Sequence, residues 1–293
     1  MREKKRSYVA RIQRQGYVFI LPTLIFFSIF LIFPMINAFQ LSFFEWNLLG
    51  PKVFVGLKNF KRLITDQRVL NSFWRTIHFS AVSVAGINVL AFAFALIFSN
   101  RMLKARNFLQ AMIFLPVVLS TVAIGVVWQF MFQTTGILSV LTVGLFGETI
   151  PWLTSTQIAP YGMIMVYVWK FTGFYLVIYI AGLLDIPEVL FEAARIDGAS
   201  FWQQLFRITI PSLKNTIALA LVSCVIFTFG TFAIQFVITE GGPSRSTEVL
   251  ALLIYFQAFR FNKFGYSAVI SVLFFLTLLV FSIIQLRLFK QQD

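Results

Sequence analysis

Long apolar runs separated by short polar stretches make up most of this chain. Six of these runs approach or exceed the roughly 20 residues that a helix needs to cross the hydrocarbon core of a bilayer. Only one of the six contains a charged residue, which is Lys170. The pattern predicts six transmembrane helices, over residues 17–39, 76–98, 108–132, 156–183, 215–238 and 266–286.

The composition agrees with a membrane protein. Of the 293 residues, 59% are hydrophobic and 12% are charged, whereas a soluble domain carries roughly 25% charged residues. A water-soluble fold of this length could not bury so much apolar surface. The expected fold is therefore all-α, a single transmembrane domain over residues 1–293 with about six spans.

The basic residues predict the orientation of the chain. Cytoplasmic loops retain an excess of Lys and Arg, and such residues precede the first predicted span, follow the last, and lie near Arg101 and in 185–214, whereas 133–155 has none. We expect a multi-pass protein of a bacterial or archaeal cytoplasmic membrane with both termini cytoplasmic. The outside loop 40–75, with six basic residues, departs from this rule.

The net charge of +13 has the same explanation. The charges sit between apolar runs rather than on one exposed basic face, so their expected partners are lipid headgroups and helix ends, and not nucleic acid. Two short extracytoplasmic helices are also predicted, one amphipathic near residues 57–63 and one over 247–261.

Residues 185–211 are far more polar than the spans on either side. Pro187 suits the first turn of a helix, Gly198 can take the left-handed conformation that ends one, and Ser200 is a good N-cap for a second helix that stops before Pro211. Small residues between these points leave a narrow surface that another protein could approach closely. A solvated loop with no partner is the alternative.

This stretch resembles the EAA loop of binding-protein-dependent ABC importer permeases, which places Glu-Ala-Ala, three residues, Gly, nine residues and then Ile-x-Leu-Pro. Ile210 replaces the usual Leu. Residues 55–60, 241–243 and 264–268 further resemble the carbohydrate-uptake subfamily, which includes the maltose-type and glycerol-phosphate-type permeases. The matching and neighbouring loop residues are Glu192, Ala193, Ala194, Asp197, Gly198, Ile208 and Pro211.

The resemblance implies that the EAA loop inserts into a cleft on a cytoplasmic ATPase. It also implies four partners: a second homologous permease, two ATPase subunits and an extracytoplasmic sugar-binding protein. This chain contains no Gly-x4-Gly-Lys-Ser/Thr phosphate loop, so we expect ATP and Mg²⁺ to bind in the partner subunits and no cofactor to bind in this chain.

Polar groups inside the spans are the candidates for the substrate path. An ionisable side chain in the bilayer usually faces a cavity or a partner, and on the fifth predicted span Cys224, Thr228, Thr231 and Gln235 recur at helical spacing. Packing between helices, and an ion pair of Lys170 with a partner permease, are the alternatives. By resemblance to the maltose-type permease, the cavity-lining residues are Lys170, Phe171, Phe174, Cys224, Phe227, Thr228, Thr231 and Ala233.

These features predict a permease subunit that translocates a sugar or oligosaccharide in an ATP-driven importer. A single cysteine and no constellation of nucleophile, base and orienting group argue against a metal site and against an enzyme. The alternatives are a permease for another solute, such as a polyamine or a phosphate ester, an ATPase-independent channel or carrier, and a membrane scaffold.

Overall fold

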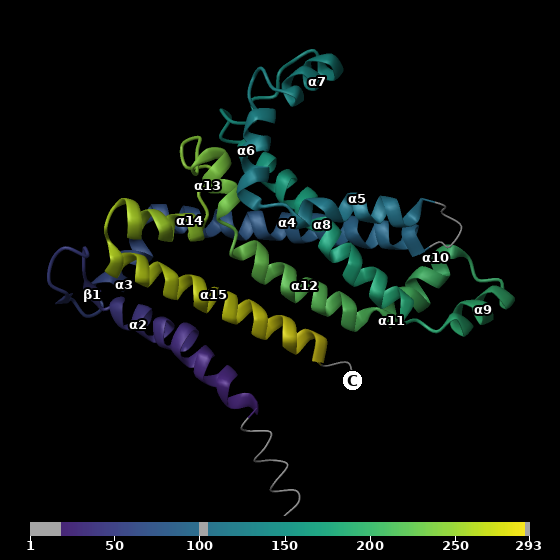
Figure 1. Cartoon of the computed structure of the whole chain (residues 1–293), viewed down its shortest axis with the longest axis horizontal. Coiled ribbons are helices and arrows are strands. Elements are labelled where there is room, and N and C mark those ends of the chain that lie inside the picture. The colour runs from purple at the N-terminus through teal and green to yellow at the C-terminus, as the bar shows by residue number, and fades with distance from the viewer. Residues whose placement is uncertain (1–18, 100–104, 291–293) are drawn as a thin grey trace, which may run out of the picture. The chain divides into compact units, whose positions relative to one another are not determined.

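The computed structural model describes residues 19–99 and 105–290, with the side chains of 289 and 290 left out, as two compact units. One unit comprises residues 1–65 and 254–273, and the other comprises 66–253 and 274–293. The basic residues predicted ahead of the first span and the loop around Arg101 lie outside the described residues. Figure 1 shows that the described elements are almost all helices, which confirms the predicted all-α class.

The first unit contains an apolar helix over Phe19–Leu41. It holds one π-helical turn, η1 (Ser28–Ile32), and ends as α2 (Phe33–Leu41). A two-stranded antiparallel ribbon follows, with β1 (Phe44–Glu45) paired to β2 (Val53–Phe54). The helix continues two residues beyond the predicted end at residue 39, and the predicted start at residue 17 lies outside the described residues.

A short amphipathic helix, α3 (Lys58–Thr65), closes this unit against the ribbon. Asn59 on its buried side donates hydrogen bonds to the carbonyls of Ser42, at 3.0 Å, and Phe44, at 2.9 Å. One turn further along the helix, the guanidinium of Arg62 lies 4.2 Å from the ring centroid of Tyr266. The helix predicted near residues 57–63 is therefore confirmed.

Two of the six basic residues of the loop 40–75 have local partners. Lys58 pairs with Glu45 at 3.3 Å, and the Lys52 ammonium lies 4.6 Å from the Trp46 ring centroid. These two cations therefore contact groups of their own segment.

The second unit is built on two long helices that pack along each other, α4 (Gln67–Ser99) and α8 (Ala159–Leu184). Ala91 and Ala95 are fully buried in this contact, because small side chains let membrane helices approach closely. A third helix, α12 (Lys214–Phe229), packs on both. Hydrogen bonds between side chains join the three: Tyr179 donates to Asn88 at 2.7 Å, and the hydroxyls of Ser80 and Thr228 lie 2.6 Å apart.

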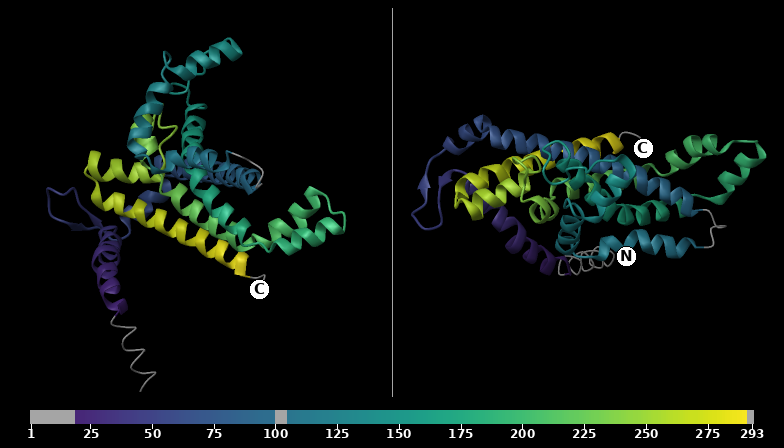
Figure 2. Two further views of the ribbon diagram at one scale, coloured as in Figure 1. Left: turned by 45° about the vertical axis from the view of Figure 1, so that its right-hand side comes forward. Right: turned by 90° about the horizontal axis from the view of Figure 1, so that it is seen from above.

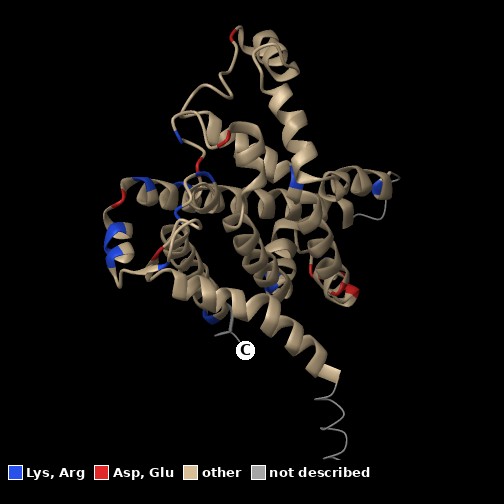
Figure 3. Ribbon diagram, turned by 60° about the vertical axis from the view of Figure 1, so that its left-hand side comes forward, with Lys and Arg blue, Asp and Glu red and all other residues tan. Residues whose placement is uncertain are grey.

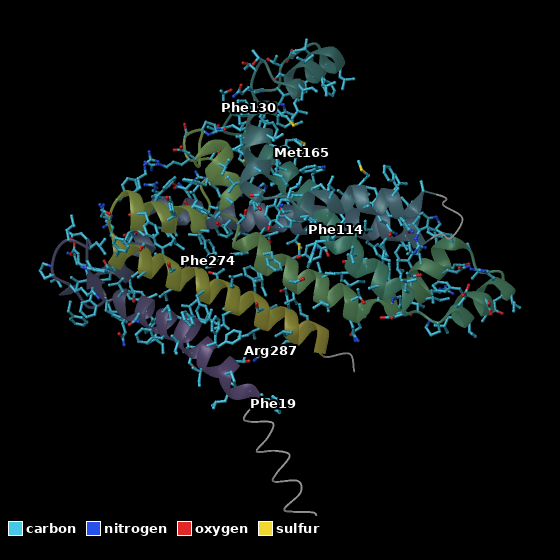
Figure 4. The ribbon with its side chains drawn as sticks, in the orientation of Figure 1. Phe19, Phe114, Phe130, Met165, Phe274 and Arg287 are labelled. Carbon is cyan, nitrogen blue, oxygen red and sulfur yellow. The ribbon has the colours of Figure 1, made fainter. Side chains whose placement is uncertain are left out.

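Two predicted spans are broken. Residues 108–132, predicted as one span, form α5 (Arg106–Val118) and α6 (Thr121–Met131), which meet at 99°. Pro116 lies inside the last turn of α5, and the chain leaves the helix at Leu119 and Ser120. In Figure 4, Phe114 marks α5 and Phe130 marks α6.

The predicted span 215–238 is also broken, because α12 ends at Phe229 and a separate helix, α13 (Ala233–Thr239), follows. Gly230 and a Phe232 outside the helical region separate the two. Before α12, the chain turns by 68° between residues 201–212 and 214–229.

Within the described residues, four helices are long and apolar enough to cross a membrane, and counting each bent pair as one span gives up to six. The sixth prediction corresponds to α15 (Phe264–Lys290). The remaining helices are short: α7 (Ile137–Phe146), α14 (Leu250–Tyr255) and η3 (Phe256–Arg260). Figure 3 shows the charged residues gathered at helix ends and in connecting segments, as a bilayer requires.

Gly173 sits where α8 crosses α5 most closely, since a Cβ added there would meet the carbonyl oxygen of Ile113 and lie 2.7 Å from the Cα of Phe114. We predict that Gly173→Val lowers the free energy of unfolding by about 1–3 kcal/mol through overpacking. Thermal unfolding of the purified chain in detergent measures this loss. Gly144→Val in α7 is the control, because nothing lies within 4 Å of a Cβ at that position; an equal loss at both sites would contradict the prediction.

Candidate functional site

The segment 185–211 forms two short helices, as predicted. The first, α9 (Glu188–Ile196), carries Glu188 in its first turn and Arg195 in its last, which matches the helix dipole at both ends. Pro187 precedes it as the N-cap residue. Figure 2 shows the two short helices, joined by a turn, extending from the ends of α8 and α12.

Gly198 ends the first helix in the left-handed region, with φ at +73°. Its N–H bonds the carbonyl of Arg195, and the N–H of Ala199 bonds the carbonyl of Ala194 at 2.8 Å. These two bonds form a Schellman motif, which favours glycine because other residues meet a steric penalty there. The predicted role of Gly198 in ending the helix is therefore confirmed.

Ser200 begins the second helix with a capping box. Its hydroxyl accepts from the N–H of Gln203, and the Gln203 side chain accepts from the N–H of Ser200 at 2.7 Å. The helix runs through α10 (Phe201–Gln204), η2 (Leu205–Thr209) and α11 (Ile210–Ser212). It therefore continues past Pro211 rather than stopping before it; the π-helical turn η2 directly precedes this proline, and such local π adjustments accommodate a proline within a helix.

The segment exposes its small residues and several large apolar ones. Glu192, Ala193, Asp197 and Gly198 are exposed, whereas Ala194 is only 9% exposed. On the second helix Ile208 is half-buried and Pro211 exposed. Large apolar side chains open to solvent, a feature typical of a protein-binding surface, are Ile196, Phe201, Trp202 and Phe206.

The Lys170 ammonium donates hydrogen bonds to backbone carbonyls at the break between α5 and α6. Its Nζ donates to the carbonyls of Pro116 at 2.9 Å and Leu119 at 2.7 Å, and the side chain is 1% exposed. These carbonyls lose their helical partners where α5 ends. In this structure the ammonium therefore contacts backbone oxygen rather than an open space, an arrangement that the sequence interpretation did not include.

The other residues predicted to line the cavity do not converge on one surface. Cys224 and Thr228 are fully buried between helices, where Thr228 bonds Ser80 and the carbonyl of Cys224. Thr231 donates to Gln235 Oε1 at 3.0 Å. Among the rest, Phe174 and Phe227 are exposed, and Phe171 and Ala233 are half-buried.

One buried ion pair was missed by the sequence analysis. Arg68 at the start of α4 donates to both oxygens of Glu248, through Nε at 2.9 Å and Nη2 at 2.6 Å, and Ser72 adds a third bond at 3.2 Å. Glu248 is 1% exposed. The partners lie 180 residues apart in the chain, so no local pattern relates them.

We predict that Lys170→Met destabilises the protein, because the carbonyls of Pro116 and Leu119 lose a charged donor in a buried position. The expected loss is about 1–3 kcal/mol in the free energy of unfolding. Lys170→Arg, which keeps a charged donor, should lose less. Thermal unfolding in detergent tests both variants, and a Lys170→Met protein as stable as the wild type would contradict this role.

Comparison with known proteins places the chain in a family. Residues 87–291 match the family described as binding-protein-dependent transport system inner membrane component. The chain is 32% identical over 281 residues to a probable permease for starch degradation products from Thermoanaerobacterium thermosulfurigenes, covering 94% of each protein. It is 34% identical over 278 residues to a trehalose/maltose permease from Thermococcus litoralis, covering 93% of this chain and 92% of that one.

The fold is similar to that of a chain in a solved bacterial ABC transporter involved in the import of the acidic polysaccharide alginate. The TM-score is 0.83 at 24% identity, over 100% of this chain and 98% of that one. The helical architecture thus has a counterpart in a known importer. The chain belongs to the family of binding-protein-dependent transport system inner membrane components, the permeases of ABC importers.

Proposed function

We propose that this protein is the permease subunit of an ATP-driven importer that translocates a sugar or oligosaccharide. The observation that carries this proposal is the exposed segment 185–211, whose Schellman-capped helix and apolar second helix form a protein-docking surface at the end of α8. The family membership makes an ATPase the partner for that surface. The two relatives named for starch products and for trehalose or maltose make a saccharide the favoured cargo.

The proposed assembly contains this chain, a second homologous permease, two cytoplasmic ATPase subunits and an extracytoplasmic sugar-binding protein. ATP and Mg²⁺ bind in the ATPase subunits, and this chain acts as a transporter rather than as an enzyme. Both termini lie on the cytoplasmic side, together with the segment 185–211. The family description, which names dependence on a binding protein and the inner membrane, supports this arrangement.

Within the segment, Glu192 and Gly198 have different proposed roles. Glu192 is an exposed charge that can pair across the interface with the ATPase. A Cβ added at Gly198 would have no atom of this chain within 4 Å. A larger side chain there would therefore make steric contact with the partner and not with this chain. The same surface includes Ala193, Ala194, Asp197, Ile208 and Pro211.

The eight residues predicted to line the substrate cavity stay part of the proposal, with two kinds of role. Phe171, Phe174 and Phe227 offer aromatic faces on which sugar C–H groups can pack. Lys170 shapes the path by holding the end of α5. Cys224, Thr228, Thr231 and Ala233 lie on or beside the broken fifth span, where a shift of α12 would expose them.

Three alternatives are testable. A permease of this family could carry another solute, such as a polyamine or a phosphate ester, through the same architecture. An ATPase-independent channel or carrier is less favoured, because it would give the apolar surface of Phe201, Trp202 and Phe206 no partner. A membrane scaffold would give that surface a partner, but it would have no use for polar side chains such as Lys170 and Thr228 within the spans.

We predict that one saccharide stimulates ATP hydrolysis by the reconstituted complex. The chain is assembled in lipid nanodiscs with its partner permease, ATPase and binding protein, and neutral and acidic oligosaccharides are screened for stimulation. Stimulation that requires the binding protein supports the sugar importer. If only a polyamine or a phosphate ester stimulates ATP hydrolysis, that solute and not a saccharide is the transported substrate. ATPase activity that no solute changes would contradict an importer.

We predict that Gly198→Asn and Gly198→Val both uncouple this ATPase activity from transport. Asparagine tolerates the left-handed conformation and valine does not, so an effect shared by the two variants reports a steric clash with the ATPase. Glu192→Ala should also reduce coupling, by about fivefold for one lost charged contact. Glu148→Ala, an exposed acidic residue outside the segment, is the control; wild-type coupling in all three test variants would contradict the docking role.

A further inference from the structure

A pocket of about 340 Å³ lies at the end of α8 opposite the segment 185–211. Tyr161 in the pocket and Leu184 at the other end of the helix are 23 residues apart, which at about 1.5 Å per residue separates them by about 35 Å. That distance exceeds the roughly 30 Å of a bilayer core. In the proposed orientation the pocket therefore faces the side from which a binding protein delivers its cargo.

Aromatic side chains form one part of the pocket wall. Trp74, His78 and Phe79 contribute from the N-terminal half of α4, and Tyr161 from the start of α8. The rings of His78 and Tyr161 meet edge to face, with centroids 5.6 Å apart. Such rings suit the C–H faces of a sugar.

The opposite part of the wall presents polar groups without partners. Gln235 is fully buried, and its Nε2 has no hydrogen-bond partner in the described part of the chain. The hydroxyl of Ser246 is buried and equally unpartnered among those residues. Arg75 also lines the pocket, and no hydrogen bond of its guanidinium is found within residues 19–99 and 105–290. A buried donor with no partner is costly, so these groups point to a polar ligand.

The wall that carries Ser246 is held in place. Glu248 is fixed by both nitrogens of Arg68 and by Ser72, and the N–H of Leu250 donates to Thr76 at 2.8 Å. Thr247 bonds Thr239 and the carbonyl of Gly242. These bonds tie the segment 246–250 to α4 and α13, so the pocket is preformed.

We infer that this pocket is an entry site that binds one end of the incoming saccharide. A sugar ring packs against Tyr161 and Trp74, and its hydroxyl groups accept hydrogen bonds from Gln235 Nε2 and Arg75. An acidic sugar would place its carboxylate on the same guanidinium, which suits bidentate recognition. This inference rests on the proposed function and assigns a site on the chain that is separate from the eight residues named above.

Thiol protection tests the site directly, since the chain has one cysteine and it is buried. In a Cys224→Ser background, Gln157→Cys places a reporter at the pocket and Glu148→Cys places one on an exposed loop outside it. The full complex in nanodiscs is treated with a charged maleimide, with and without maltotriose or an alginate trisaccharide. ATPase stimulation by the same saccharide is measured first on the wild type.

With a stimulating saccharide and the binding protein present, we expect the rate of maleimide modification at position 157 to fall by about fivefold, the effect of one or two hydrogen bonds. The rate at position 148 should not change. Gln235→Leu should remove this protection, because it deletes the Nε2 donor. It also removes the acceptor of the Thr231 hydroxyl, so Thr231→Val, which loses the same bond and keeps Nε2, is the matched control and should retain the protection. Unchanged modification at 157 while the saccharide stimulates the wild type would overturn the entry site and leave the importer standing. Protection by the unloaded binding protein would also overturn it. Stimulation by a polyamine or a phosphate ester alone would overturn the saccharide site and leave an importer, whereas no stimulation by any solute screened would refute the importer and the site together.

Discussion

Backbone carbonyl groups that lose their helical partner inside a bilayer have no water to bond, and each one left unsatisfied costs several kcal/mol. This protein bends its third apolar run by 99° and so creates such carbonyls. Lys170 supplies the donor for Pro116 and Leu119 from a neighbouring helix, and Gly173, one turn further, lets the two backbones approach. A charge that would be expensive alone thus stabilises the bend.

The same helix connects the two surfaces to which we assign function. One end of α8 leads into the segment 185–211, and the other carries Tyr161 in the aromatic pocket. Between them, α8 contacts α4, α5 and α12 through buried polar bonds and small residues. A movement of the docking segment driven by an ATPase would therefore act on the core of the second unit through a continuous helix.

Apolar run length was sufficient to predict the all-α class, and glycine, proline and serine positions predicted both short helices of the segment 185–211. The breaks at residues 118–121 and 229–233 cannot be located from hydropathy, because the mean hydropathy of the run stays high through a bend whatever the direction of the helix. Likewise, Arg68 and Glu248 meet across 180 residues. The sequence singled out Lys170 correctly as unusual, but whether its ammonium meets solute or backbone depends on where α5 ends, which only the packed helices determine.

The most direct test of the central claim is the accumulation of a labelled saccharide in proteoliposomes that contain the assembled complex. The binding protein is supplied on the side opposite the segment 185–211, and ATP with Mg²⁺ is supplied on the side of that segment. Our account predicts uptake against a concentration gradient that stops when either ATP or the binding protein is omitted. Saccharide flux down its gradient at the same rate without ATP would show a channel or carrier and contradict the account.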